Sequence, residues 1–243
     1  MPILAPTPQQ QRVFVHPGFQ WESADAYLFD IDGTLLNSRD AVQYFAFRTA
    51  IREELGLESS IDNVPVQGNT DPGILRAVLR QQGLPEEEIT AALPNIVERM
   101  CAEVERNRAE LKPEICPSIR ELISRLRKAG KLLGIASGNL GPIGRMKLEA
   151  AGLAQEFSFG AFSHPCERRS EIFQDGIRQA RALAGGRAKV YIVGDTPSDI
   201  DAARQVEAPV IVFATGVFTF DQLMGSRPDA CFACAADLLG FSQ

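Results

Sequence analysis

Short apolar segments alternate with helical patterns along the chain, and this alternation restricts its possible folds more than any other feature. The clearest apolar segments, each with the length of a buried strand, cover residues 26–29, 131–136, 189–193 and 209–213, with weaker candidates at 157–162 and 230–233. Between them, apolar residues recur every three or four positions, which is the spacing of a buried helix face. Buried strands that alternate with helices predict an α/β fold with a doubly wound, Rossmann-like parallel sheet as its core. The helix expected after residue 118 has Ser118 and Glu121 at the spacing of a capping box.

The segment from about residue 38 to residue 112 differs from the rest of the chain. It has helical periodicity and no convincing strand, and Gly83-Leu84-Pro85 and Leu93-Pro94 interrupt it as loops or helix starts would. We therefore expect an all-helical domain at 38–112, inserted into a discontinuous core of residues 1–37 and 113–243.

Composition and charge narrow the class of protein. Hydrophobic residues make up 45% and charged residues 23% of the 243 residues, which excludes a disordered chain and allows a sizeable core. The 25 basic and 31 acidic residues give a formal net charge of −6. This balance does not favour nucleic-acid binding, because neutralising phosphates requires clustered Lys and Arg. It fits a cytoplasmic enzyme of small metabolites, whereas monomer and dimer are both compatible with it.

Two further features concern location and redox state. The sequence has neither the pattern of a signal peptide nor an apolar stretch of roughly 20 residues, so we expect no membrane partner. Five cysteines is an odd number, and Cys231 and Cys234 lack the further ligands of a structural zinc site. We expect reduced thiols, and we assign no role to residues 1–22.

Pairs of carboxylates follow two of the predicted strands. Asp30 and Asp32 come directly after the first, and Asp195 and Asp199 follow the strand at 189–193. The carboxyl ends of parallel strands meet at one edge of the sheet, where α/β folds bind ligands. Acids crowded there would repel one another unless a cation lay between them, and Mg²⁺ is the common choice for oxygen ligands. Asp201 is expected to be solvated at the start of the next helix.

A third polar cluster, Ser137-Gly138-Asn139, follows the strand at 131–136. A hydroxyl with small neighbours can present its oxygen and a backbone N–H to a phosphate. Ser137 does not fit a hydrolase nucleophile elbow, because Ile135 and Asn139 occupy the positions where that motif requires glycine.

Together these clusters resemble the haloacid dehalogenase (HAD) superfamily, and most closely its branch of phosphoglycolate-phosphatase-like and β-phosphoglucomutase-like enzymes. The resemblance is carried by Asp30-x-Asp32-Gly33-Thr34 and by Gly194-Asp195-x-x-x-Asp199, in this order, and it spans nearly the whole chain.

The resemblance implies roles for these residues. Asp30 would be the nucleophile that forms an aspartyl-phosphate, Asp32 the general acid and base, and Ser137 a ligand of the phosphoryl group. Mg²⁺ would be held by Asp30, the backbone carbonyl of Asp32 and Asp195, with Asp199 in support. The neighbouring residues implied in phosphate binding are Gly33, Thr34, Gly138 and Asn139.

The third motif departs from the pattern of many relatives, which place a Lys before a Pro. No Lys lies between Lys147 and Lys189, whereas Glu167-Arg168-Arg169-Ser170 stands at a predicted helix start. Some members resemble this form, so Arg169 is the expected cation, with Arg168 as the alternative.

The helical insert resembles the family's cap domain, which closes over the core and contacts the leaving group. Gly68-Asn69-Thr70-Asp71 is similar to a cap segment of the phosphoglycolate-phosphatase-like relatives, which makes Thr70 and Asp71 candidate substrate ligands. They fit equally well as a helix N-cap and a first-turn acid. Hinges are expected near residues 37–38 and 112–113.

The resemblance thus predicts a Mg²⁺-dependent phosphatase for a small phosphate monoester, with an inserted cap domain. A dehalogenase is disfavoured, because those relatives lack an acid at the position of Asp32. Two alternatives stay open: a phosphomutase of the β-phosphoglucomutase type, and a non-enzymatic module that binds phosphate or a partner.

Overall fold

The computed structural model describes residues 12–164 and 166–241, so the first half of the segment 1–22, residues 1–11, lies outside the described residues. The strands are β1 (Val13–Val15), β2 (Ala26–Phe29), β3 (Leu36–Ser38), β4 (Pro113–Ile115), β5 (Leu132–Leu140), β6 (Phe159–Ser163), β7 (Val190–Gly194), β8 (Val210–Phe213) and β9 (Ala230–Phe232). The α-helices are α1 (Val42–Leu55), α2 (Asp71–Gln81), α3 (Glu86–Arg106), α4 (Ile119–Lys128), α5 (Gly141–Ala150), α6 (Arg169–Ala184), α7 (Pro197–Gln205), α8 (Phe220–Gly225) and α9 (Ala235–Gly240). Short 3₁₀ turns follow α3 and α5.

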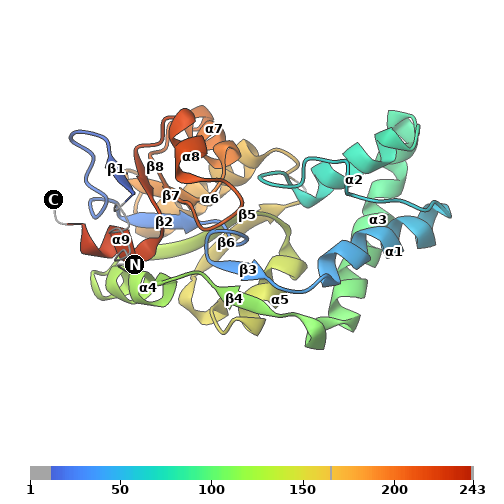
Figure 1. Ribbon diagram of the computed structural model, residues 1–243, viewed down its shortest axis with the longest axis horizontal. Coiled ribbons are helices and arrows are strands. Elements are labelled where there is room, and N and C mark those ends of the chain that lie inside the picture. Colours follow the sequence, from blue (N-terminus) through green and yellow to red (C-terminus); the bar gives the residue numbers. More distant parts are fainter. Residues whose placement is uncertain (1–11, 165, 242–243) are drawn as a thin grey trace, which may run out of the picture.

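Seven strands form one sheet in the order β1-β9-β8-β7-β2-β5-β6. All neighbouring pairs are parallel except β1 with β9, which adds an antiparallel edge strand. The sheet is wound in both directions from β2, and helices cover both of its faces (Figure 1). The predicted α/β class with a doubly wound sheet is confirmed.

Side chains of β2 alternate between two apolar layers, because successive residues of a strand point to opposite faces. Tyr27 and Phe29 pack with residues of α4 and α9, whereas Ala26 and Leu28 pack with residues of α6 and α7. Burial on both faces explains why the strand reads as an unbroken apolar run in the sequence. It also fixes the end of β2, and therefore Asp30, in the middle of the sheet.

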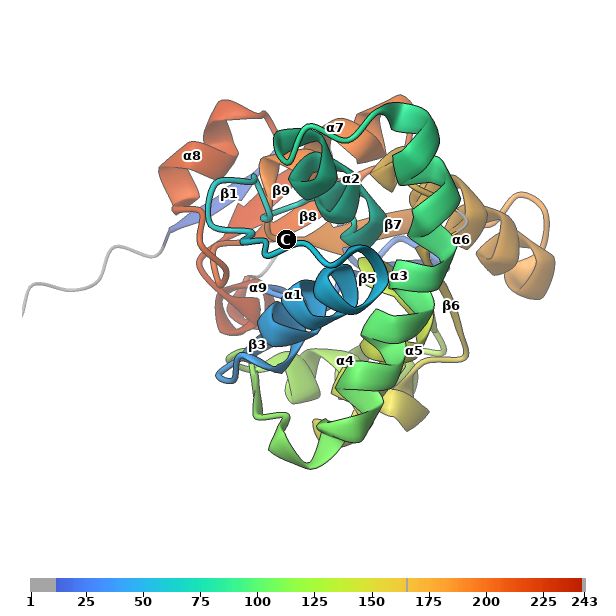
Figure 2. The same ribbon diagram turned by 90° about the vertical axis from the view of Figure 1, so that its right-hand side faces the viewer.

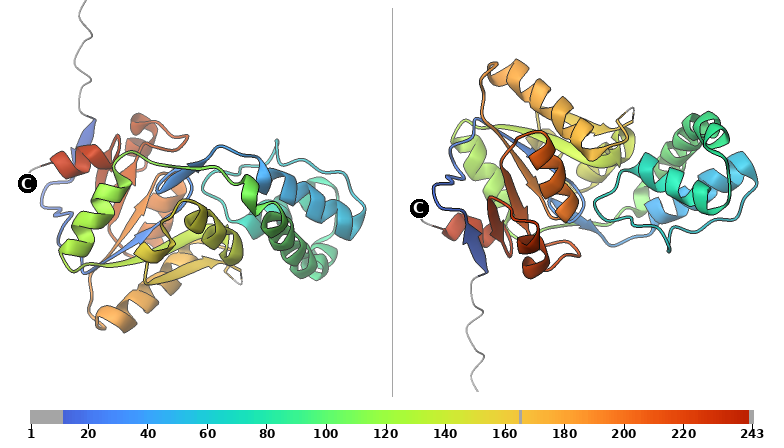
Figure 3. Two further views of the ribbon diagram at one scale, coloured as in Figure 1. Left: turned by 90° about the horizontal axis from the view of Figure 1, so that it is seen from below. Right: turned by 90° about the horizontal axis from the view of Figure 1, so that it is seen from above.

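Helices α1, α2 and α3 form a separate block at one end of the sheet, as Figures 1 and 3 show from three sides. Viewed from that end, the three helices lie in front of the sheet (Figure 2). Their apolar core, which includes Phe47, Leu75 and Met100, extends onto Ile143 and Met146 of α5. The inserted helical block therefore packs directly against the α/β core.

The two segments that connect this block to the core pair with each other. β3 and β4 are antiparallel, with Asn37 opposite Glu114 and Ser38 opposite Pro113. We propose domain boundaries at residues 37/38 and 112/113, and this pairing supports that division.

Three local predictions are corrected by the structure. Ser118 makes no side-chain cap, because it has a left-handed backbone (φ 57°) where a capping residue needs an extended one. Pro94 does not interrupt the helix but lies inside α3. The apolar face of α3, with Ile89, Ile96 and Met100 buried, offsets the roughly 3 kcal/mol cost of an internal proline. β5 continues through residues 137–140, which the sequence had suggested were outside the strand.

Among the described residues, no helix is long and apolar enough to cross a membrane. All five cysteines are unpaired, and Cys116 and Cys231 are buried.

Candidate active site

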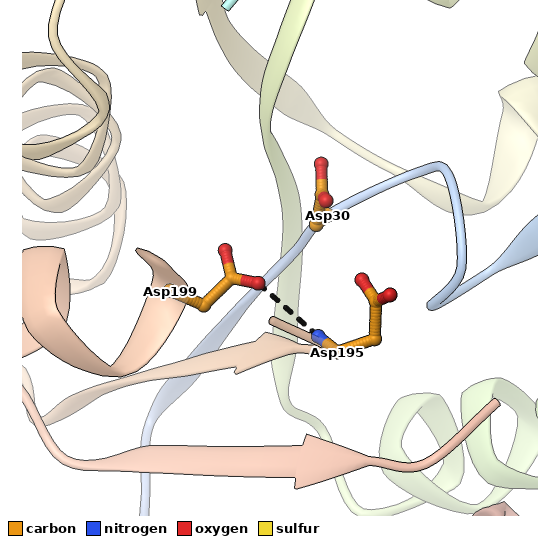
Figure 4. Close-up of side chains that lie close together, drawn as sticks. All are labelled: Asp30, Asp195 and Asp199. Atoms are coloured by element: carbon orange, nitrogen blue, oxygen red, sulfur yellow. Dashed lines mark hydrogen bonds between the residues drawn. The ribbon is translucent and has the colours of Figure 1, made fainter. Parts of the chain in front are cut away.

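Three aspartates that are far apart in sequence meet at the carboxyl edge of the sheet. Asp30 follows β2, Asp195 follows β7, and Asp199 lies in the first turn of α7. A carboxylate oxygen of each lies within 4.8 Å of the others, and all three residues are buried (Figure 4). The structure thus brings together three of the four acids that the sequence singled out, whereas the Asp32 carboxylate is outside this group.

The N-terminus of α7 holds Asp199 in place. Thr196 caps the helix, and its hydroxyl donates to Asp199 Oδ2 at 2.7 Å. The same oxygen accepts the backbone N–H of Thr196 at 2.9 Å and that of Asp195 at 3.2 Å, the bond drawn in Figure 4. Pro197 at the first helical position costs no hydrogen bond there. Asp199 is thus fixed by the turn that also positions Asp195.

Arg169, the first residue of α6, lies between two of these acids. Its Nε donates to Asp199 Oδ1 at 2.6 Å, and its Nη2 lies 2.6 Å from Asp30 Oδ2. The first contact is a hydrogen bond and the second is an ion pair, so one guanidinium holds both acids. Burial opposes the positive charge, but Asp199 and Asp30 outweigh it and raise the pKa of Arg169 above its ordinary value.

The neighbouring Arg168 points elsewhere. Its side chain is 78% exposed and pairs with Glu171 in the first turn of α6. Of the two arginines that the sequence left as candidates, the structure places Arg169 beside Asp30.

The acidic cluster carries more negative charge than Arg169 offsets. Burial raises the pKa of Asp30 to about 6, with Arg169 opposing this and Asp199 adding to it. Burial, Asp199 and Asp30 raise the pKa of Asp195 well above its usual range. Buried carboxylates with raised pKa values are stabilised by a nearby cation. Oxygen donors of this kind suit a hard divalent ion, so the residues fit a metal site.

The Asp32 carboxylate is held by a different set of side chains, Lys147 and Asn139. Lys147 Nζ lies 2.7 Å from Asp32 Oδ2 and 2.9 Å from Oδ1, and Asn139 Nδ2 donates to Oδ2 at 2.7 Å. Lys147 is 3% exposed, whereas the Asp32 side chain is 40% exposed and borders a cavity. Asn139 was predicted near this site, but Lys147 was missed. The sequence feature that could have revealed Lys147 is its position on the buried face of α5, on the same side of the helix as Ile143 and Met146.

Ser137 and Gly138 border the cavity within β5, at a shift in its register with β6. The Ser137 hydroxyl forms a hydrogen bond that lowers the pKa of Asp30, and it accepts from Asn139 Nδ2 at 3.0 Å. A side chain at Gly138 would overlap the backbone carbonyl of Asn69 in the helical block. Glycine is therefore required where the helical block approaches β5.

Gly33 has φ +83°, and a side chain there would overlap the Asp195 carboxylate. Gly216, in the loop after β8, closes on the same carboxylate from another side and was not predicted.

Thr34 is fully buried and outside the cavity lining, and its hydroxyl donates to Asp195 Oδ1 at 3.1 Å. The structure thus places Thr34 behind Asp195, at a distance from where a phosphate would enter.

Thr70 and Asp71 join the helical block to the core. Thr70 caps α2 by accepting from the Gly73 N–H, and its hydroxyl donates to the Glu167 carbonyl at 2.7 Å. Asp71 accepts from the Leu140 N–H at 2.8 Å, and it borders the cavity whereas Thr70 does not. Burial raises the pKa of Asp71 to about 7, although the Leu140 N–H opposes the shift.

A cavity of about 370 Å³ lies between the core and the helical block. We call its surface on the core the core wall: Asp30, Asp32, Gly33, Ser137, Gly138, Asn139, Lys147, Arg169, Asp195, Thr196, Gly216 and Val217. We call the surface on the helical block the cap wall: Gln43, Tyr44, Phe47, Ile61, Val66, Gln67, Gly68, Asn69, Asp71 and Ile74. Asn37, Ser38 and Asp40, on the linking segment, complete the lining.

A doubly wound α/β core with buried acids at its carboxyl edge and a helical insert beside them is the architecture of an α/β enzyme. The chain belongs to the haloacid dehalogenase-like hydrolase family, whose sequence pattern matches residues 27–213.

Individual relatives agree with this assignment. The chain is 25% identical to a probable phosphatase, IndB, of Dickeya dadantii over 88% of this chain and 91% of the relative. It is 27% identical to a phosphoglycolate phosphatase of Synechococcus elongatus over 88% and 95%. Among solved structures, CbbY from Rhodobacter sphaeroides in complex with phosphate matches with a TM-score of 0.64 at 22% identity, over 88% of this chain and 96% of CbbY. A β-phosphoglucomutase from Clostridium difficile matches with a TM-score of 0.63 at 17% identity, over 88% and 93%. These two structures show the common fold.

Proposed function

We propose that the protein is a Mg²⁺-dependent phosphatase that hydrolyses a small phosphate monoester through an aspartyl-phosphate on Asp30. The observation that carries this proposal is Arg169, which lines the cavity and is buried beside Asp30, with Nη2 2.6 Å from Asp30 Oδ2. A phosphoryl oxygen at the cavity side of Asp30 would meet the same guanidinium, since planar arginine donors suit phosphate oxygens. The phosphatase names of the relatives support the same reaction class.

In the first step, an oxygen of Asp30 attacks phosphorus and the bond to the leaving oxygen breaks. Arg169 and Ser137 bind the phosphoryl oxygens and oppose the negative charge that the nucleophile meets. Asp32 passes a proton to the leaving oxygen as general acid. In the second step, Asp32 takes a proton from water, which attacks the aspartyl-phosphate and releases inorganic phosphate and free Asp30.

Asn139 and Lys147 are positioning residues in this proposal. Both donate to the Asp32 carboxylate, and Lys147 also donates to Asn139 Oδ1 at 3.0 Å. This network holds the Asp32 carboxylate at the wall of the cavity.

Mg²⁺ would be held by Asp30, Asp195 and the backbone carbonyl of Asp32, with Asp199 in support. When bound, it would neutralise the acids and polarise the phosphoryl group. The buried acids with raised pKa values are the observation that supports this set of ligands.

The experiment measures hydrolysis of p-nitrophenyl phosphate with Mg²⁺ and with excess EDTA. We expect Mg²⁺-dependent turnover, and a loss of roughly a thousandfold or more in kcat for Asp30→Asn, since the nucleophile is removed. Asp201→Asn is the matched control, because Asp201 lies on α7 but is exposed and pairs with Arg204. Absence of turnover in the wild-type protein would favour the binding module. Equal turnover by Asp30→Asn and wild type would contradict the mechanism.

A further inference from the structure

We infer that the alcohol released from the substrate is uncharged, so that esters with a second anionic group, such as phosphorylated hydroxy acids and bisphosphates, are poor substrates. This inference rests on the proposed phosphatase function and adds the class of substrate. It starts from the two walls of the cavity, because the core wall binds the phosphoryl group and the cap wall faces the leaving group.

The cap wall offers no positive charge. Among the described residues that line the cavity from the helical block, none is Lys, Arg or His. The side chains that could contact a leaving group are apolar, as Phe47, Ile61 and Val66 are, or carry an amide, as Gln67 does. A carboxylate or second phosphate placed here would lose water without gaining a cation, which disfavours binding.

The cations elsewhere in the lining are already paired. Within the described part of the chain, the lining contains two basic residues, Lys147 and Arg169, against five aspartates. Lys147 contacts Asp32, and Arg169 contacts Asp30 and Asp199. The guanidinium of Arg169 lies beside Asp30, where the transferred phosphoryl group belongs in the proposed mechanism. Neither cation is available for a second anionic group on the substrate.

The groups next to the cap wall also offer an anion no positive charge. Asp71 is the acidic residue of that wall, and Asp40 lies beside it on the linking segment. Arg48 is on α1 near Tyr44 but outside the lining, where its Nε donates to the Ser59 carbonyl at 3.1 Å and its guanidinium lies near Glu58. A leaving group with a negative charge would therefore meet acids and apolar side chains.

The volume adds a limit on size. A cavity of about 370 Å³ is at the small end of the range for small-molecule sites, and it must hold the phosphoryl group as well. Tyr44 and Val217 stand at its edge, and Val217 is 61% exposed. The substrate that fits is a phosphate monoester of a small, uncharged alcohol or phenol with an apolar face.

The test compares two substrates of the same shape, 4-carboxyphenyl phosphate and 4-carbamoylphenyl phosphate. We expect kcat/KM to be at least about tenfold higher for the neutral amide, since one like charge in a partly desolvated site has an effect of this order. A carboxylate that reacts as well as the amide, or better, would overturn the inference and leave the phosphatase function standing. Absence of turnover with both esters and with p-nitrophenyl phosphate would instead contradict the phosphatase function itself.

A pair of variants tests whether the cap wall is the cause. Gln67→Lys adds a cation to the cap wall, and Gln82→Lys makes the same change at an exposed position at the end of α2, outside the lining. We expect Gln67→Lys to shift the ratio of kcat/KM values several-fold toward the carboxylate, and Gln82→Lys to leave it unchanged. An equal shift in both variants, or none in Gln67→Lys, would overturn the role of the cap wall.

Discussion

The core wall and the cap wall enclose the same cavity, but they differ in charge, in burial and in the elements that carry them. The core wall places Asp30, Asp195 and Arg169 at the ends of strands and at the start of a helix, and all three are buried. The cap wall consists of residues of α1, of α2 and of the long loop between them, and its side chains are mostly uncharged. This difference fits the division of roles that we propose, in which the core wall carries the reaction and the cap wall selects the leaving group.

We expect the largest loss of activity when the cation of the core wall, Arg169, is removed. Arg169→Ala should lower kcat/KM by roughly a hundred- to a thousandfold, because the charge that opposes Asp30 and binds the phosphoryl group is lost. Arg168→Ala is the matched control and should change it less than about threefold, as expected of an exposed ion pair. Arg169→Lys, which restores a point charge, should recover part of the loss. Steady-state kinetics on the three variants would contradict the assignment of Arg169 as the phosphoryl-binding cation if Arg168→Ala had the larger effect.

Asp71, the buried acid of the cap wall, should make the stability of the protein depend on pH. Its pKa is raised from 3.8 to about 7, so the folded protein retains a proton that the unfolded chain releases. Stability should therefore fall as the pH rises from about 4 to 7, and it should level off above 7. Each pKa unit corresponds to about 1.4 kcal/mol, so the total is at most about 4 kcal/mol.

Urea unfolding in EDTA at pH 4.5 and 7.5 measures this effect. Asp30 contributes in the same direction, because burial raises its pKa to about 6, so the comparison with Asp71→Asn isolates Asp71. Asp71→Asn keeps an acceptor for the Leu140 N–H and removes the titration. A wild-type protein whose pH dependence matches that of Asp71→Asn would show that Asp71 is ionised in both states.

The two walls also differ in how far the sequence predicted them. Asp30, Asp195 and Ser137 could be placed because each lies at the end or within the last residues of a buried strand, and parallel strands end at one edge. Nothing comparable marks the cap wall, where residues such as Gln67 lie in a loop that only tertiary packing brings to the cavity. The expected role of Thr70 in substrate binding stays a prediction, and its hydroxyl is engaged with the Glu167 carbonyl.

Within the core, the missed residues have a common cause. Lys147 and Gly216 come from positions with no polar cluster around them, and they reach the site because α5 and the loop after β8 fold back over it. The edge strand β1 and the β3–β4 pair are only three residues long each, too short for a period-2 pattern to be recognised. The prediction that Pro94 interrupts a helix was wrong because α3 is stabilised by packing within the whole helical block, which the local sequence does not show.

The most direct test of the central claim is the stereochemical course of hydrolysis at phosphorus. A thiophosphate monoester made chiral at phosphorus by ¹⁶O and ¹⁷O, turned over in ¹⁸O water, reports how many displacements occur. Attack by Asp30 followed by attack of water gives two in-line displacements, each of which inverts the configuration. We therefore expect net retention of configuration at phosphorus. Net inversion would show that water attacks the substrate directly, and it would contradict the role of Asp30 as the nucleophile.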